Sequence, residues 1–185
     1  MDAVDDAFRA WPRAGFLRAG ERDRASYDGP LPIGGGQTSS QPRTVAAMLR
    51  LLEAGPGMRV LDVGSGSGWT TALLAHLVGP GGEVRGVELE PSLVEFGARN
   101  LAATGQPWAS IVQARPGVLG LPEHAAYDRI LVSAEPRRLP AELVAQLADG
   151  GRLVIPVRGT MTLVTRHGDD HRETHHGSYR FVPLR

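Results

Sequence analysis

Three glycines at alternate positions separate a short apolar segment from a longer apolar run, a pattern that can hold a cofactor. The short segment spans residues 60–63, and the glycines are Gly64, Gly66 and Gly68. Glycine permits a tight turn and carries no Cβ that would keep a ligand away from the backbone. A second apolar segment, at 83–87, ends in Glu88, whose carboxylate can accept hydrogen bonds from both hydroxyls of a ribose. The spacing therefore predicts a strand-to-helix turn that binds a nucleotide-bearing cofactor.

The spacing of these glycines distinguishes two classes of cofactor. Dinucleotide-binding turns typically read Gly-x-Gly-x-x-Gly. This turn reads Gly-x-Gly-x-Gly, and Asp62 lies near the end of the strand before it. A turn of this kind does not have to bind the second phosphate of a dinucleotide. The pattern favours S-adenosylmethionine over NAD. Glycines also build ordinary turns, but the strand before, the helix after and the acid at the next strand end together favour a cofactor site.

A second segment, residues 29–42, is rich in turn formers and small hydroxyl side chains, which predicts a loop with a functional role. Pro42 suits the first position of a helix, with Ser40 as its N-cap, and we expect that helix over 42–54. Ser40 and Thr38 can donate hydrogen bonds that orient a substrate carboxylate. The alternative is that Ser40 only caps the helix and Thr38 only shapes the loop.

Strands and helices are expected to alternate along the rest of the chain. Apolar patterns predict further strands at 108–113, 127–134, 152–157, 161–166 and 179–184, and helices at 69–78, 91–103 and 141–147, the last ended by Asp149-Gly150-Gly151. Apolar residues between 4 and 16 predict a short helix broken by Pro12. The alternation predicts the α/β class. We expect three layers, with a mostly parallel sheet covered on both faces and an antiparallel edge.

Length and composition limit the possible classes of protein. With 185 residues, of which 42% are apolar, the chain is long enough for one well-filled core. We expect a single domain, 1–185, in which residues 1–40 form an N-terminal helix and the catalytic loop and residues 41–185 form the core. Cysteine is absent, which excludes disulfides, thiolate metal sites and cysteine nucleophiles. All twenty basic residues are arginine, which excludes a lysine Schiff base.

Charge and hydropathy narrow the choice of partners. Twenty basic and twenty acidic residues cancel, and no basic stripe with interleaved aromatic residues occurs, so we expect no nucleic-acid partner. The sequence has no run of about eighteen apolar residues, and its amino end is acidic rather than basic and then apolar. We therefore expect a cytoplasmic protein without a membrane partner. The pattern leaves the oligomeric state open.

Four histidines fall within ten residues near the end of the sequence: His167, His171, His175 and His176. Four imidazoles so close together suggest a metal site. The segment is polar, however, and is interrupted by Gly168 and Gly177. We interpret it as a solvated hairpin and predict no metal site.

Four ordered blocks, which extend across nearly all of the chain, resemble the protein-L-isoaspartate O-methyltransferases. The blocks are Leu-Pro-Ile-Gly-x-Gly-Gln-Thr-x-Ser-Gln-Pro at 31–42, the glycine turn at 63–68, Asp-Gly-Gly-Arg-Leu-Val-x-Pro-Val at 149–157 and Phe-Val-Pro-Leu at 181–184. The first block is particular to this family, whereas the glycine turn is shared by most class I methyltransferases.

The resemblance implies a Rossmann-like methyltransferase fold of three layers, with its last sheet strands in that family's unusual order. It further implies transfer of the methyl group of S-adenosylmethionine to the free carboxylate of an L-isoaspartyl residue, the damage product of Asn and Asp. The ester then collapses to a succinimide, which gives some normal aspartate on hydrolysis. The resemblance places the catalytic loop at 37–40, with Ser40 in the position of the active-site serine and Thr38 beside it. It implies cofactor contacts from Gln37, Thr38, Ser39, Ser40, Asp62, Gly64, Ser65, Gly66, Gly68, Glu88, Leu89, Pro116 and Gly117.

The chain departs from the family pattern at three places. Where the family usually has Gly-Asp-Gly, this chain has Arg115-Pro116-Gly117, and proline cannot replace the aspartate that accepts a hydrogen bond from the adenine amino group. Ser39 stands where an apolar residue is usual. Residues 133–138 (Ser-Ala-Glu-Pro-Arg-Arg) replace small apolar residues at the end of a predicted strand. We expect Glu135, Arg137 and Arg138 to contact a substrate, with a solvated loop as the alternative.

Two functions besides repair of damaged protein stay open. The chain could esterify an ordinary aspartate of a ribosomally made peptide and drive aspartimide formation, which the changes at residues 39 and 135–138 slightly favour. It could instead be a degenerate methyltransferase that serves as a binding or scaffold protein, which Pro116 suggests. Either enzyme would act on a protein or peptide partner.

Overall fold

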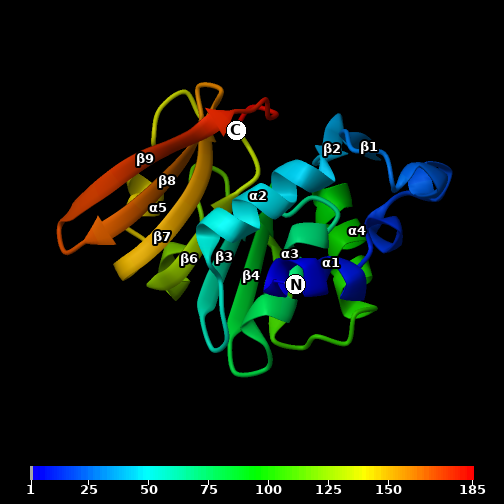
Figure 1. Ribbon diagram of the computed structural model, residues 1–185, viewed down its shortest axis with the longest axis horizontal. Helices are drawn as coiled ribbons and strands as arrows, with labels where there is room; N and C mark the ends of the chain where they lie inside the picture. The colour runs from blue at the N-terminus through cyan, green and yellow to red at the C-terminus, as the bar shows by residue number, and fades with distance from the viewer. Residues whose placement is uncertain (1) are drawn as a thin grey trace.

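The computed structural model describes residues 2–185 and places seven strands in one mixed sheet, in the order β5-β4-β3-β6-β7-β8-β9 (Figure 1). Met1, the first residue of the predicted domain, lies outside the described residues. The strands are β3 (Arg59–Val63), β4 (Glu83–Glu88), β5 (Ala109–Gln113), β6 (Tyr127–Val132), β7 (Leu147–Val157), β8 (Thr160–His167) and β9 (Asp170–Ser178). Strands β3 to β7 pair in parallel, whereas β8 pairs antiparallel with both β7 and β9. The predicted α/β fold is confirmed.

The central strands are buried on both faces, which explains why they are apolar at consecutive positions. In β3, Val60 packs into the core on one side of the sheet and Leu61 into the core on the other. In β6, Leu131 packs into the same core as Val60, and Ile130 packs into the same core as Leu61. A strand of a parallel sheet between two layers has no solvent face, so it reads as a continuous apolar run rather than as an alternation.

Helices cover the two faces unequally. The helices are α1 (Ala3–Ala10), α2 (Pro42–Leu52), α3 (Trp69–Val78), α4 (Pro91–Ala102) and α5 (Ala141–Val144), and short 3₁₀ turns occur at Arg13–Phe16, Ala19–Arg24 and Pro122–His124. Side chains of α1, α2, α3 and α4 join the core on one face. The other face is covered by α5 and the loops around residues 114–121. Helix α3 is apolar almost all round because α1 covers it from outside (Figure 1).

The predicted loop at 29–42 contains a two-stranded hairpin, formed by β1 (Leu31–Gly34) and β2 (Gln37–Ser39). Leu31 and Ile33 pack against Leu93 and Phe96 of α4, so the hairpin is anchored to the core. Pro42 begins α2 as predicted, but the prediction that Ser40 is the N-cap is wrong. The N-cap is Gln41, whose side chain makes no capping hydrogen bond, and the amide of Arg43 in the first turn donates to Oδ1 of Asp28 at 3.1 Å.

Two further predictions near the end of the chain are wrong. The helix predicted at 141–147 ends at Val144, and Asp149-Gly150-Gly151 lies inside β7, at an irregularity in its pairing with β6. Gly150 has a φ of 72°, which glycine adopts without strain, so the glycines serve a bulge rather than a helix end.

The last strand of the sheet is β9 (Asp170–Ser178), not the predicted 179–184. Residues 179–184 instead run beside the segment after β6, where an isolated bridge pairs Glu135 with Pro183. The histidine-rich segment therefore forms the β8–β9 hairpin at the edge of the sheet, as its interpretation as a solvated hairpin required. Among residues 2–185, no group of three or more His, Cys, Asp or Glu side chains is arranged to hold a metal ion. No helix in the same range has the length and apolar content needed to cross a bilayer.

Candidate active site

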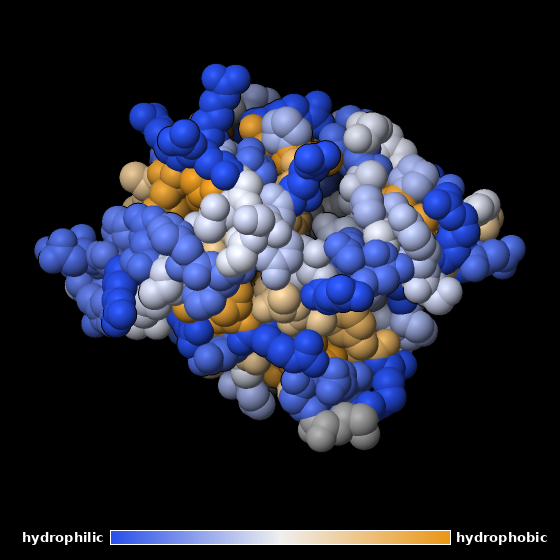
Figure 2. Space-filling view, turned by 45° about the horizontal axis from the view of Figure 1, so that its top comes forward, coloured by the Kyte–Doolittle hydropathy of each residue, from blue (hydrophilic) through white to orange (hydrophobic). Residues whose placement is uncertain are grey.

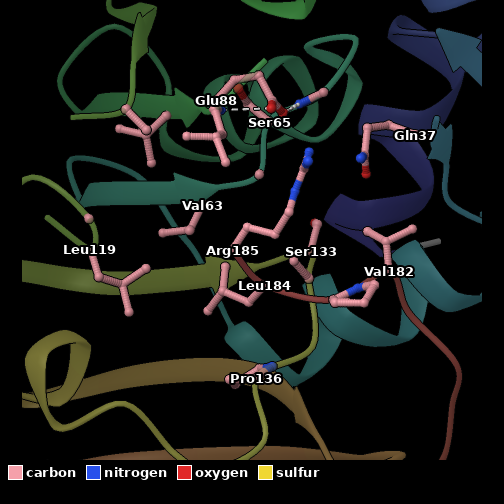
Figure 3. A pocket seen from close by; sticks show the side chains of 18 of the residues that line it. Gln37, Val63, Ser65, Glu88, Leu119, Ser133, Pro136, Val182, Leu184 and Arg185 are labelled. Atoms are coloured by element: carbon pink, nitrogen blue, oxygen red, sulfur yellow. Dashed lines mark hydrogen bonds between the residues drawn. The ribbon is translucent and has the colours of Figure 1, made fainter. Parts of the chain in front are cut away.

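The carboxyl ends of β3, β4 and β6 border one cavity of about 690 Å³, which is ample for a nucleotide-bearing ligand. Segments distant in the sequence complete its wall: 37–40, 63–67, 87–89, 114–120, 182–185 and most of 133–138. Figure 2 shows this face of the molecule hollowed, with apolar surface bordered by hydrophilic residues. In Figure 3, Val63, Leu119 and Leu184 form apolar walls opposite the polar Ser65, Glu88 and Gln37, and the side chain of Arg185 extends across the cavity.

The glycine turn forms part of the cavity wall. Gly64, Gly66 and Gly68 have φ angles of 80°, 53° and 83°, a region that favours glycine. A Cβ on Gly68 would lie 2.8 Å from the carbonyl oxygen of Gly97, so that position has no room for a side chain. The amides of Gly64 and Ser65 both donate to the carbonyl of Val87, which fixes the turn against β4. The hydroxyl of Ser65 is buried without a hydrogen-bond partner among residues 2–185, as expected of a group that binds a ligand.

Glu88 ends β4 at the wall of the cavity, and its carboxylate is held by three backbone amides. Gly66 donates to Oε2 at 2.9 Å, and Leu89 and Glu90 donate to Oε1 at 2.7 and 2.9 Å (Figure 3). These bonds fix the carboxylate and tie it to the glycine turn. A carboxylate offers about four acceptor positions, so one position, on Oε2, is left for a ribose hydroxyl.

Asp62 is fully buried below the turn and does not line the cavity. Its Oδ2 accepts hydrogen bonds from the hydroxyls of Thr70 and Thr71, both at 2.7 Å, which join β3 to the start of α3. Burial raises the pKa of Asp62 to about 6, against the lowering effect of the two threonines. Its Oδ1 has no partner among residues 2–185. Asp62 therefore acts on the cavity through the turn, not by lining it.

The 37–40 segment borders the same cavity as the glycine turn. Gln37, Thr38, Ser39 and Ser40 all line the cavity, and Gln37 faces it in Figure 3. Within residues 2–185, nothing hydrogen-bonds the hydroxyls of Thr38 or Ser40. The structure thus contradicts the alternative that Ser40 caps α2, and it leaves the Ser40 hydroxyl free for a ligand.

A buried arginine that the sequence analysis did not identify holds this segment in place. Arg13 is 4% exposed, and its Nε donates to the hydroxyl of Ser39 at 3.1 Å. Its other nitrogens donate to the backbone carbonyls of Ser39, Tyr27 and Gly29. Burial lowers the pKa of Arg13, and the charge of Asp28 opposes that shift. The position of Arg13 among apolar residues, between Trp11 and Phe16, was the only signal in the sequence, and it is a weak one.

Arg13→Met is expected to lower the free energy of unfolding by about 3 kcal/mol, because it leaves several buried oxygens without a donor. For a chain of this length, that corresponds to a fall in Tm of about 6–12 °C. Ser39→Ala is the matched control. It should change Tm far less, since Arg13 keeps its three carbonyl partners. Equal Tm values for the Arg13 variant and the wild type, measured by calorimetry, would contradict this role.

The predicted adenine end of the cavity is the 114–120 loop. Pro116 and Gly117 line the cavity beside Leu89, which is 38% exposed, so an apolar surface is available to a base. Arg115 forms an ion pair with Glu123, in which Nη2 lies 2.7 Å from Oε2. All predicted cofactor and catalytic residues therefore line one cavity, except Asp62 and Gly68.

The segment after β6 contributes differently from what was expected. Arg137 and Arg138 line the cavity, but Glu135 does not. The carboxylate of Glu135 accepts a hydrogen bond from the amide of Gly159 at 3.0 Å, and its backbone pairs with Val182 and Leu184. Glu135 therefore holds the 182–185 segment against the sheet, and the prediction that it contacts a substrate has no support in this geometry.

The fold and the cavity together define a class of protein. A parallel sheet with a glycine turn after one strand, and a buried carboxylate at the end of the next, is the framework of Rossmann-like enzymes that bind a nucleotide-bearing cofactor. The spacing of the glycines and the cavity at the strand ends place this chain among the methyltransferases of that framework.

The chain belongs to the protein-L-isoaspartate(D-aspartate) O-methyltransferase (PCMT) family, whose family model matches residues 1–185. It is similar to the protein-L-isoaspartate O-methyltransferase of Aeropyrum pernix, with 46% identity over 187 residues that cover 98% of this chain and 72% of the relative. It also resembles a solved protein-L-isoaspartate O-methyltransferase, with a TM-score of 0.90 and 28% identity over 100% of this chain. The chain spans 61% of the length of that solved protein.

A second solved structure is a beta-aspartate methyltransferase (PCMT) from Plasmodium falciparum in complex with S-adenosyl-L-homocysteine. Its TM-score is 0.89 at 27% identity, and the comparison covers 100% of this chain and 91% of that one. The resemblance therefore extends to a relative of nearly the same length that holds the demethylated cofactor.

Proposed function

We propose that this chain transfers the methyl group of S-adenosylmethionine to the free carboxylate of an L-isoaspartyl residue in a protein or peptide. One observation carries the proposal: the free hydroxyl of Ser40 and the glycine turn with Glu88 lie in the same cavity. We also propose that the whole chain acts as one domain. The continuous core that α1 shares with α2, α3 and the sheet supports this.

The residues of the turn fit the cofactor. S-adenosylmethionine, when bound, supplies a methyl group on a positively charged sulfur that leaves as a neutral thioether. Glu88 would hold the ribose, and the unpartnered hydroxyl of Ser65 and the backbone of Gly64 and Gly66 would hold the methionine end. The apolar surface of Leu89 and Pro116 would face the base.

The reaction requires the protein mainly to position the substrate carboxylate and to exclude water from it. A substrate carboxylate is already ionised near neutral pH, so no general base is required. Ser40, with Thr38 beside it, would donate a hydrogen bond to one carboxylate oxygen and leave the other free to attack. Apolar residues such as Val63 and Leu119 would exclude water from the acceptor (Figure 3).

Two matched peptides test the choice of substrate, one with an isoaspartyl residue and one with aspartate at the same place. Methyl transfer is followed by methanol release after the ester collapses. We expect turnover of the isoaspartyl peptide. Turnover of the aspartyl peptide alone would contradict the proposal and favour a peptide-tailoring enzyme. Absence of any heat on calorimetric titration with millimolar S-adenosylmethionine would favour a scaffold protein.

Pro116→Asp is expected to tighten the binding of S-adenosylmethionine by about threefold to tenfold, because it supplies an acceptor for the adenine amino group at the cavity wall. The control is Pro116→Ala, which removes the ring and restores an N–H but adds no carboxylate. Calorimetric titration measures both dissociation constants. Equal tightening in both variants would assign the effect to the backbone rather than to the carboxylate.

A further inference from the structure

Three arginines without partners lie together at the carboxyl edge of the sheet. Arg137 and Arg138 follow β6, and Arg158 occupies the turn between β7 and β8. All three are exposed, and none forms an ion pair or a hydrogen bond with any group in residues 2–185. By contrast, Arg43 and Arg50 on α2 are both paired with carboxylates. We name these three residues the basic ledge.

The basic ledge adjoins the cavity of the active site. Its three arginines line a second hollow of about 430 Å³, and two of them, Arg137 and Arg138, also line the main cavity. The β7–β8 turn lies at the same end of the sheet as the C-terminus, whose last four residues border the main cavity (Figure 1). A chain that leaves the main cavity on this side therefore passes over the ledge.

Two carboxylates near the second hollow have other partners, whereas Glu142 lines the main cavity. Glu173 lines the second hollow but contacts His171, with Oε1 3.3 Å from Nε2. Glu135 accepts a hydrogen bond from the amide of Gly159. Leu139, Val157 and His175 also line the hollow, so two apolar side chains and an imidazole lie beside the arginines.

We propose that the basic ledge binds an acidic segment of the substrate polypeptide that flanks the methyl-accepting residue, so that this enzyme prefers isoaspartyl sites within acidic sequence. This inference rests on the proposed function. It goes further, because it names the chemistry of the preferred substrate. Each exposed ion pair is weak, but three in one place would raise kcat/KM for an acid-flanked peptide by about threefold to tenfold at low salt.

The experiment compares two isoaspartyl peptides that differ only in their flanks, three glutamates in one and three glutamines in the other. The measured quantity is the ratio of kcat/KM for the acidic peptide to that for the neutral one. We expect a ratio well above one for the wild type at low ionic strength, and a ratio near one at about 0.5 M salt, where the Debye length is only a few ångströms. Placing the acids before or after the isoaspartyl residue shows the direction of the bound chain.

Charge-removing variants locate the effect. Arg158→Gln should lower the ratio, and the triple variant Arg137→Gln/Arg138→Gln/Arg158→Gln should bring it near one. The matched control is Arg99→Gln/Arg172→Gln/Arg180→Gln, which also removes three exposed arginines, and these line neither hollow. The control should keep the wild-type ratio. An equal fall of this ratio in the control would show that the preference depends only on the net charge of the protein, and it would overturn the proposal.

The remaining outcomes separate this inference from the proposed function. Turnover of both peptides with a wild-type ratio near one would overturn the ledge and leave the methyltransferase assignment intact. Turnover of neither peptide would overturn both. Stronger inhibition by a single-stranded oligonucleotide than by an acidic peptide of equal charge, lost in the triple variant, would assign the ledge to nucleic acid instead.

Discussion

Ser40→Ala is expected to lower kcat for an isoaspartyl peptide by about 10- to 100-fold, because a hydrogen bond to a charged group contributes about 1.5–3 kcal/mol. The hydroxyl is free of partners within residues 2–185, and Ser40 lines the cavity that the glycine turn also borders. Its proposed contact is with the substrate. The dissociation constant of S-adenosylmethionine should therefore be nearly unchanged.

The position of Ser40 outside the N-cap of α2 also predicts how Ser40→Ala affects stability. If Ser40 were the N-cap, alanine there would destabilise the helix by about 1 kcal/mol. Because Gln41 is the N-cap, Tm should stay at the wild-type value. Ser39→Ala is the neighbouring control, since its hydroxyl is held by Arg13. A parallel loss of turnover, cofactor affinity and Tm in the Ser40 variant would show that its role is structural.

The sequence predicted the half of the site that is encoded locally. Strand, glycine turn, helix and the acid of the next strand follow one another within a short stretch, so spacing alone placed Gly64, Gly66 and Glu88 together. Parallel pairing of β3 with β4 then brings the two strand ends to one edge. That edge is where open α/β sheets bind ligands.

The contacts that the sequence could not predict join distant segments. Arg13 and Ser39 are 26 positions apart, and the polar character of Arg13 gives no sign that it is buried. The edge strand β9 was missed because both of its faces are largely exposed, so it lacks the alternation that marks a half-buried strand. The apolar residues at 179–184 predict a strand, but within the described residues this segment bonds through its backbone to Gly159 and Glu135 alone and extends no ladder of the sheet.

Glu88→Ala is expected to weaken the binding of S-adenosylmethionine by about 100-fold, which corresponds to roughly 3 kcal/mol. The loss has two sources. The variant lacks the acceptor for a ribose hydroxyl, and it releases the amides of Gly66, Leu89 and Glu90, so the turn that holds the methionine end loosens as well. At saturating cofactor, KM for the peptide should change little, because the proposed substrate contacts are those of Ser40 and Thr38 and not of Glu88.

Glu88→Gln separates these two sources of affinity. The amide keeps one acceptor oxygen but presents an NH₂ group to a backbone amide that needs an acceptor, so binding should weaken by about tenfold, between the alanine variant and the wild type. Glu90→Ala is the control, since its carboxylate lies two positions away and does not line the cavity. Calorimetric titration gives the dissociation constants, and Tm without ligand reports the state of the turn. A Glu88→Ala protein that melts like the wild type and binds the cofactor equally well would exclude this carboxylate from the cofactor site.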